Sequence, residues 1–269
     1  MTKAELAEQI FLKKTYLCVG LDTDFDKIPK HLQSLPDAVF EFNKQIIDHT
    51  QDLCVAYKIN TAFYESMGAK GWDIMQRTAD YIPASHLKIA DAKRGDIGNT
   101  SRQYANAFFK VLNFDAITVA PYMGEDSVKP FLEFPGKWAI VLALTSNSGS
   151  ADFQQQKTGD EWLYEKVLRK VSNWGNTGNL MFVAGATKPS ELQSIRKIIP
   201  DHFILVPGVG FQGGSLSEVS KYGLNDSCGL LVNVSRAIIY ASENEDFALE
   251  ARAIALQYQE EMEGYLATI

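Results

Sequence analysis

Two carboxylates and a lysine stand close together in the stretch 91–100, which reads DAKRGDIGNT. The stretch follows a short apolar run, 86–90, that predicts a β-strand. Side chains two residues apart point to the same face of a strand, so Asp91 and Lys93 would project together from its end, with Asp96 just beyond in the loop. Neighbouring carboxylates keep an ammonium charged, and a second anion placed there would experience a strong field. The spacing therefore fits either catalysis on an anionic substrate or an ordinary ion pair.

The elements that must position these residues form a repeated pattern of short apolar runs and amphipathic segments. The runs predict strands over 16–21, 53–59, 86–90, 116–119, 138–144, 180–184, 203–207 and 229–234. The amphipathic segments predict helices over 36–50, 64–81, 99–112, 126–133, 160–174, 189–199, 214–222 and 246–265. A strand–helix alternation implies parallel strands with right-handed crossovers. Eight such units in 269 residues predict an α/β protein built as a (β/α)8 TIM barrel, with an open doubly wound sheet as the alternative.

We expect residues 1–269 to form a single barrel domain, because no flexible linker or shift in composition marks a boundary. Residues 2–12 predict an extra N-terminal helix before the first strand. Residues 146–158 carry the weakest pattern, and we expect a mobile loop there that could cover a site.

The active site of a TIM barrel lies at the C-terminal ends of its strands. Charged and Gly-rich residues gather at those ends here, from several different strands. They are Asp22, Lys58, Asp91, Lys93, Thr145, Ser146, Asn147, the segment 207–214, Ser235 and Arg236. Convergence from several strands is stronger evidence for a site than any one motif.

The segment 208–213, GVGFQG, matches the dinucleotide-binding pattern G-x-G-x-x-G, and Asp226 stands near the expected offset for a ribose-binding acid. We reject that interpretation because the Rossmann fold carries this motif in its first βα turn, whereas here it follows the seventh strand. Gly-rich loops after strands seven and eight of a barrel form phosphate sites. Gln212 could donate an amide and Arg236 could hold the phosphate in a bidentate pair. Plain turn chemistry is the alternative.

The acidic loop after the first strand, residues 22–26, suggests two interpretations that involve a metal ion. A calcium loop would need Gly and Glu where this chain has Lys27 and Gln33, so that interpretation fails. An aspartyl-phosphate nucleophile would need a magnesium site that this loop alone does not supply. Asp22 lies nearest the strand end and is the best functional candidate, whereas Asp24 and Asp26 read as solvated loop residues.

Lys58 lies inside an apolar strand, where an ammonium must be paired to offset its desolvation. It predicts either a structural ion pair with Asp22 or Asp91, or a site residue. The four histidines show neither metal-ligand nor nucleophile–base spacing, so we expect no metal site.

The composition limits the classes of partner. Hydrophobic residues make up 46% and charged residues 22%, with a net charge of -7 and no basic block. That balance disfavours nucleic acid and anionic membranes as partners. No apolar run reaches membrane-spanning length, and no signal peptide is expected. Three widely separated cysteines predict reduced thiols in a cytoplasmic protein.

The stretch 91–100 resembles the signature of orotidine 5′-phosphate decarboxylases, and Arg94, Ile97 and Thr100 favour these enzymes over related sugar-phosphate enzymes. The resemblance extends, in order along the chain, to 19–22, 57–60, 145–147, 185–187, 207–214 and 235–238. The elements at 145–147 and 185–187 are similar to those of the longer bacterial, type 2, branch.

The resemblance implies decarboxylation of orotidine 5′-phosphate to UMP and CO2 without a cofactor, the last step of de novo UMP synthesis. It also implies a TIM barrel that works as a homodimer with shared active sites. Lys93 would be the proton donor, in a charged array with Lys58 and Asp91 and with Asp96 from the partner subunit. Substrate binding would involve Asp22, Lys58, Thr100 of the partner, Ser146, Asn147, Gln212, Gly213 and Arg236.

Two alternatives stay open at this point. One is a metal-dependent relative, a sugar-phosphate decarboxylase or hexulose-phosphate synthase, since these share the D-x-K-x-x-D triplet. The other is a non-enzymatic nucleotide-binding barrel, which would need no lysine between two acids.

Overall fold

The fold is a closed barrel of parallel strands, seen in a computed structural model that describes residues 1–186, 189–210 and 213–269. Its strands are β1 (Leu17–Gly20), β2 (Ala56–Asn60), β3 (Leu87–Arg94), β4 (Ala116–Val119), β5 (Trp138–Leu144), β8 (Leu180–Ala184), β9 (Ile204–Pro207) and β10 (Leu230–Val234). They pair in parallel in the order β1-β10-β9-β8-β5-β4-β3-β2, and β2 closes on β1. The predicted TIM barrel is confirmed.

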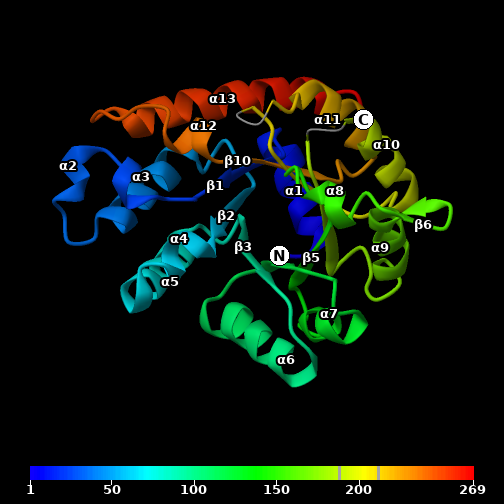
Figure 1. Ribbon diagram of the computed structural model, residues 1–269. Coiled ribbons are helices and arrows are strands. Elements are labelled where there is room, and N and C mark those ends of the chain that lie inside the picture. The colour runs from blue at the N-terminus through cyan, green and yellow to red at the C-terminus, as the bar shows by residue number, and fades with distance from the viewer. Residues whose placement is uncertain (187–188, 211–212) are drawn as a thin grey trace.

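Helices surround the strands, with α13 along one side of the barrel and α6 and α7 on the opposite side (Figure 1). The longer helices are α1 (Lys3–Lys13), α3 (Ala38–Thr50), α5 (Gly68–Tyr81), α6 (Gly98–Asn106), α7 (Glu125–Leu132), α9 (Leu163–Val171), α10 (Pro189–Ile198), α11 (Leu216–Gly223) and α13 (Phe247–Leu266). Short helices are α2 (Lys30–Gln33), α4 (Thr61–Glu65), α8 (Ser150–Phe153) and α12 (Arg236–Ile239), with a 3-10 turn η1 (Phe25–Lys27) and a π-helical turn η2 (Ala107–Val111). None of the helices in the described part of the chain is long and apolar enough to cross a membrane.

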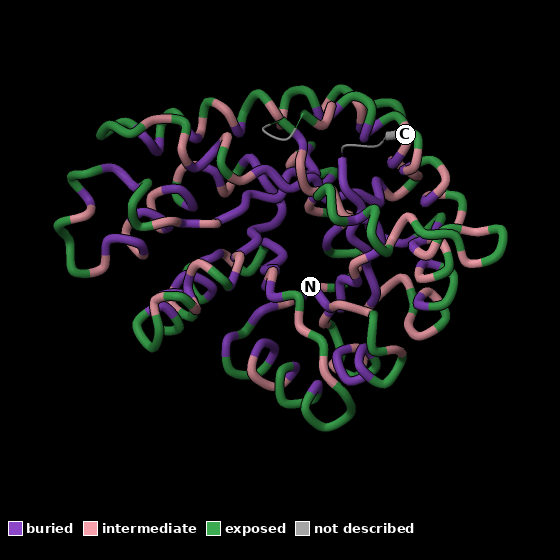
Figure 2. The backbone as a smooth tube through the Cα atoms, in the orientation of Figure 1, coloured by how far each residue is buried: buried purple, intermediate pink, exposed green. Residues whose placement is uncertain are grey.

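Hydrophobic periodicity explains why these elements pack as they do. The barrel strands are buried along nearly their whole length, as expected for parallel strands covered on both faces (Figure 2). The helices bury one stripe each. In α9, Tyr164, Leu168 and Val171 are buried at helical spacing while charged residues face solvent.

The extra N-terminal helix is confirmed as α1, and Thr2 caps it. The Glu5 N–H donates to Thr2 Oγ1 at 3.3 Å and the Thr2 N–H donates to Glu5 Oε2 at 2.7 Å, a capping box. The indole of Trp138 donates to the Met1 carbonyl at 2.8 Å, and Lys3 donates to the Asp201 carbonyl at 2.8 Å. These contacts tie the N-terminus to the N-terminal ends of the strands, away from the predicted site.

Three predicted helices have clearly different limits. The helix expected over 160–174 begins only at Leu163, because Glu161 and Trp162 form the strand β7, which pairs with β6 (Lys157–Thr158). The helix expected over 64–81 is divided into α4 and α5, because Gly68 takes a left-handed conformation at φ 63° that interrupts the helix. The helix expected over 99–112 leaves the α-helical pattern after Asn106 and ends in the π-helical turn η2.

Candidate active site

Four charged side chains meet at the C-terminal ends of β1, β2 and β3. The Lys58 ammonium lies 3.1 Å from Asp22 Oδ1 and 3.2 Å from Asp91 Oδ2. The Lys93 ammonium lies 2.6 Å from Asp91 Oδ1. Asp22, Lys58, Asp91 and Lys93 therefore form a row of alternating charge. The structure brings these four predicted residues together.

The two lysines of the row differ in how far their side chains are buried. The Lys58 side chain is 5% exposed, whereas the Lys93 side chain is 51% exposed. Burial alone would lower the pKa of Lys58, but Asp22 and Asp91 raise it above its ordinary value. Burial alone would raise the pKa of Asp91, but Lys58 and Lys93 lower it to about 2. Lys58 and Asp91 are thus held in their charged forms at the centre of the row, and Lys93 is its most exposed member.

The strand that carries Asp91 and Lys93 is longer than predicted, which corrects the expected end at residue 90. β3 continues to Arg94, and its register with β4 shifts between Ala90 and Arg94. Lys93 has a left-handed backbone at φ 45°, a conformation that costs a non-Gly residue about 1–3 kcal/mol. The two side chains meet as predicted, but across an irregular, strained segment rather than through regular alternation.

Thr118 and Arg94 hold this strained segment. The Lys93 N–H donates to Thr118 Oγ1 at 2.8 Å, and the Thr118 hydroxyl donates to Asp91 Oδ1 at 3.0 Å. The Arg94 guanidinium donates to the Ala92 carbonyl at 2.9 Å and pairs with the Glu65 carboxylate. Sequence reasoning missed Thr118. A hydroxyl near the end of the otherwise apolar run 116–119 was the available signal.

Two adjacent cavities open on the charged row. One of about 500 Å³ is lined by Lys58, Asp91, Lys93, Thr118, Leu142, Thr145, Ser146, Asn147, Gln154, Val183, Leu205 and Pro207. The other, of about 150 Å³, is lined by Asp22, Lys58, Asp91, Pro207, Gly208, Val209, Asn233, Ser235 and Arg236. Lys58, Asp91 and Pro207 line both. Together they form one elongated site with the charged row at its centre.

The loop after β5 contains short regular elements, so residues 146–158 are more structured than their weak sequence pattern predicts, while the mobility expected of this loop stays a prediction. It contains α8 and the first strand of a hairpin, β6 (Lys157–Thr158) paired antiparallel with β7 (Glu161–Trp162). Gly159, at φ 72°, supplies the tight turn that a two-residue hairpin loop requires. The Gly-Asp pair at 159–160 was the overlooked signal.

Gln154 holds the beginning of that loop. Its Oε1 accepts from the Thr145 N–H at 2.7 Å and its amide donates to Thr145 Oγ1 at 2.9 Å. Gly185 of the adjacent loop allows close approach, since a Cβ there would lie 2.8 Å from the Cβ of Ser146. Ser146 and Asn147 thus border the larger cavity from a braced position.

The Gly-rich loop after β9 turns tightly beside the smaller cavity. Gly208, Gly210 and Gly213 have φ values of 96°, 78° and 84°, all in the left-handed region. The Gly210 N–H donates to the Gly214 carbonyl at 3.0 Å, which closes the turn. Gln212 lies outside the described residues. Gly213 is exposed, and Arg236 is exposed at the start of α12.

Asp96 and Thr100 stand apart from the charged row. The Asp96 carboxylate accepts from the Ile97 N–H at 2.7 Å, and the Asp96 carbonyl accepts from Ser101 Oγ at 2.6 Å. Thr100 is exposed in the first turn of α6. Within the chain as described, neither side chain forms a hydrogen bond or ion pair with Lys93.

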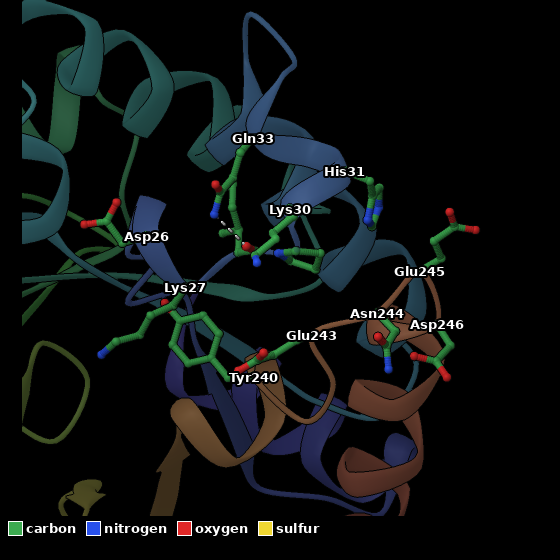
Figure 3. A pocket seen from close by; sticks show the side chains of 12 residues that line it. Asp26, Lys27, Lys30, His31, Gln33, Tyr240, Glu243, Asn244, Glu245 and Asp246 are labelled. Carbon is green, nitrogen blue, oxygen red and sulfur yellow. Dashed lines mark hydrogen bonds between the residues drawn. The ribbon is translucent and has the colours of Figure 1, made fainter.

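A larger cavity lies elsewhere, between the 26–33 segment and the 240–246 segment (Figure 3). Its volume is about 800 Å³. The first segment lines it with acidic and basic side chains, and the second with acidic side chains. It contains none of the predicted site residues, so we place the candidate site at the two smaller cavities. Among residues 1–186, 189–210 and 213–269, no group of three or more His, Cys, Asp or Glu could hold a metal ion.

Comparison with known proteins yields one family. A model described as "Orotidine 5'-phosphate decarboxylase / HUMPS family" matches residues 15–251. The chain is 57% identical to an orotidine 5′-phosphate decarboxylase of Bacteroides fragilis over 100% of both sequences. It is 60% identical to one from Christiangramia forsetii over 99% of each. The solved structure of Leishmania donovani OMP decarboxylase has a TM-score of 0.83 and 37% identity, covering 98% of this chain and 99% of that one.

Proposed function

The chain belongs to the orotidine 5′-phosphate decarboxylase / HUMPS family, and we propose that it converts orotidine 5′-phosphate to UMP and CO2 in pyrimidine biosynthesis. The resemblance recognised in the stretch 91–100 is thereby confirmed at the level of the family. The relatives at 57% and 60% identity match this chain over essentially their whole length and are named orotidine 5′-phosphate decarboxylases, which makes this chain a carboxy-lyase.

The observation that carries the proposal is the charged row of Asp22, Lys58, Asp91 and Lys93 at the centre of the elongated site. Loss of CO2 from the pyrimidine leaves an electron pair on a ring carbon that has no adjacent electron sink. An ammonium at that carbon stabilises the developing charge and then supplies the proton. Lys93 is the half-exposed ammonium of the row and borders the larger cavity, so we assign the proton donor to it.

The two cavities suggest how the nucleotide lies. The larger cavity has an apolar wall of Leu142, Val183 and Leu205 and a polar rim that includes Ser146 and Asn147, which suits a pyrimidine ring. Lys58, which lines both cavities, and Asp22, which lines the smaller one, would contact the ribose.

The phosphate would lie at the smaller cavity. Arg236 lines this cavity with Gly208 and Val209 and offers a bidentate cation there. We assign Gln212 and Gly213, which follow in the sequence, to the phosphate on the family resemblance. The phosphate is remote from the reacting carbon, so its binding energy can contribute to positioning the base.

The separation of Asp96 from the row supports a homodimer with shared sites. The loops after β3 and β4 present a hydrophobic surface beside it: Ile97 is 57% exposed, Tyr122 89% and Met123 47%. The side chain of Met123 lies next to Gly95, so these loops are neighbours. We propose that a second copy covers this surface and that Asp96 and Thr100 enter the partner's site.

A complementation experiment tests the shared site. Mixing Asp96→Ala protein with Lys93→Ala protein should restore activity to about a quarter of the wild-type value, because random exchange forms hybrid dimers with one intact site. Each variant alone is the control. If subunit exchange is verified and activity is not restored, each site is complete within one chain.

The organisation into one domain and the cytoplasmic location remain our proposals. Contacts of both ends of the chain with the barrel region support one domain. The Trp138 indole of β5 donates to the Met1 carbonyl at 2.8 Å, and the Thr15 hydroxyl, just before β1, donates to the Met262 sulfur of α13 at 3.4 Å. The three cysteines Cys18, Cys54 and Cys228 are buried and free, which suits a reducing compartment.

A direct assay tests the reaction. Purified protein is incubated with orotidine 5′-phosphate, and the fall in substrate absorbance is followed with and without a chelator. Turnover that is insensitive to the chelator is the expected result. Chelator-sensitive turnover of a sugar phosphate would favour the metal-dependent relatives, and UMP binding without turnover would favour a nucleotide-binding barrel.

A substitution tests the assigned proton donor. Lys93→Ala should lose at least about 1,000-fold in kcat, because it removes the group that both stabilises and protonates the carbanion. UMP binding, measured by calorimetry, should persist. Near-normal turnover by this variant would refute the role.

A further inference from the structure

The loop that carries Asp22 is held by side chains from outside its own strand. The Tyr64 hydroxyl donates to the Leu21 carbonyl at 3.0 Å. The Thr23 hydroxyl donates to Asn43 Oδ1 at 2.6 Å, and both of these side chains are buried. The residues on either side of Asp22 are therefore fixed to α3 and α4.

Tyr240 holds the loop at Asp22 itself. Its hydroxyl donates to the Asp22 carbonyl at 3.1 Å and accepts from the Asp24 N–H at 2.8 Å. A phenol has one hydrogen to donate and lone pairs to accept, so one hydroxyl can make both bonds at once. The Tyr240 hydroxyl therefore links the backbone of Asp22 to that of Asp24, on either side of Thr23.

The ring of Tyr240 is packed independently of its hydroxyl. It stacks on Phe42 with ring centres 6.1 Å apart and an interplanar angle of 24°. The Lys27 ammonium lies 6.0 Å from the ring centre, and Figure 3 shows the two residues side by side. Removing the hydroxyl alone would leave this packing in place.

Tyr240 also follows directly after the short helix that presents Arg236. Its N–H donates to the Arg236 carbonyl at 3.2 Å. A single turn of chain thus carries the proposed phosphate ligand and the hydroxyl that fixes Asp22. The side chain of Asp22 in turn contacts Lys58 at 3.1 Å, a contact that a shift of the loop by about 1 Å would break.

We propose that Tyr240 is a positioning residue, whose hydroxyl sets the Asp22 carboxylate against Lys58 at the ribose position. The inference rests on the proposed function and extends it, because it names a residue outside the charged row on which nucleotide recognition depends. Tyr240 acts through Asp22 and does not itself reach the nucleotide.

A double-mutant cycle tests this directly, with Tyr240→Phe, Asp22→Asn, the double variant and the wild-type protein. Tyr240→Phe should lower kcat/KM for orotidine 5′-phosphate about tenfold, the order expected when a positioning hydrogen bond is lost. Most of the change should be in KM. In the Asp22→Asn background the same substitution should change kcat/KM by less than about twofold, because the group it positions is gone.

Tyr16→Phe is the matched control. The Tyr16 hydroxyl is buried and bonded to Ser220 at the other end of β1. Its loss should lower the unfolding temperature without changing kcat/KM. A Tyr240→Phe variant that behaves like this control, or that loses the same factor in both Asp22 backgrounds, would overturn the inference.

The same cycle measured on the dissociation constant for UMP separates the two proposals. Non-additive UMP binding without turnover would refute the decarboxylase and retain the role of Tyr240. Turnover with additive effects in the cycle would retain the decarboxylase and refute the role of Tyr240.

Discussion

Thr118 offers the most direct test of how the active-site strand is held. Its side chain is 1% exposed, and its hydroxyl bonds both the Lys93 N–H at 2.8 Å and Asp91 Oδ1 at 3.0 Å. Thr118→Val keeps the shape of the side chain and removes both bonds. The N–H of Lys93 and one oxygen of Asp91 are left without that partner.

The size of the effect follows from these contacts. A neutral hydrogen bond contributes about 1 kcal/mol and one to a carboxylate about 2 kcal/mol. Relaxation of the strained backbone at Lys93 offsets about 1 kcal/mol of that loss. The free energy of unfolding should fall by about 2 kcal/mol, which lowers the unfolding temperature by about 5 °C in a chain of this size. Because relaxation displaces the Lys93 ammonium, kcat/KM should fall by about 100-fold.

Two control variants make the result interpretable. Thr118→Ser retains the hydroxyl and should keep most of the activity. Thr15 is also fully buried, and its hydroxyl accepts from the Leu17 N–H at 3.1 Å and contacts the Met262 sulfur, away from the site. Thr15→Val should therefore lose stability but no activity.

Thermal unfolding by circular dichroism and the absorbance assay with orotidine 5′-phosphate measure the two quantities. If Thr118→Val matches Thr15→Val, with lower stability and kcat/KM within about twofold of wild type, the hydroxyl does not position the catalytic segment. The reasoning about strain at Lys93 would then be wrong.

Three further predictions concern the rest of the site. The lowered pKa of Asp91, about 2 against an ordinary 3.8, contributes roughly 2 kcal/mol of stability that is present above about pH 4 and lost as the pH falls through 2. The difference in unfolding free energy between wild type and Asp91→Asn should therefore shrink from pH 5 to pH 2, and a constant difference would contradict the lowered pKa of Asp91. Gly185→Ala should raise KM several-fold because its Cβ would displace Ser146, while Gly264→Ala, with open space around it, should not. Arg236→Ala should weaken UMP binding about 50-fold but leave uridine binding unchanged, as calorimetry can show, since it removes one charged hydrogen-bonding group for the phosphate.

The fold was predictable because its signals are local. Each barrel strand is a short apolar run, and its hydrophobic side chains face the core whether or not the neighbouring strands are known. Thr2 and Glu5 likewise mark the start of α1 through a capping box that depends on four consecutive residues. The predicted helix boundaries were wrong where the backbone conformation of a single residue sets them, as at Gly68 between α4 and α5.

The extension of β3 could not be predicted from the sequence. Residues 91–94 are polar and charged, a composition that does not indicate a strand. They are held in line by partners distant in sequence: the Ala120 N–H bonds the Arg94 carbonyl at 2.8 Å, and Thr118 bonds Lys93. Such contacts exist only after the barrel closes.

The barrel, the family and the charged residues could all be identified before folding was considered, because strand periodicity and the stretch 91–100 are visible in consecutive residues. The arrangement of those charges depends on the folded chain. Lys58 lies between Asp22 and Asp91 since the strands that carry them are neighbours in the closed barrel. Thr118 and Tyr240 join the site through hydroxyl groups from β4 and the end of α12. A hydroxyl has no sequence pattern of its own, so its role becomes visible only when folding brings its partners within hydrogen-bond distance.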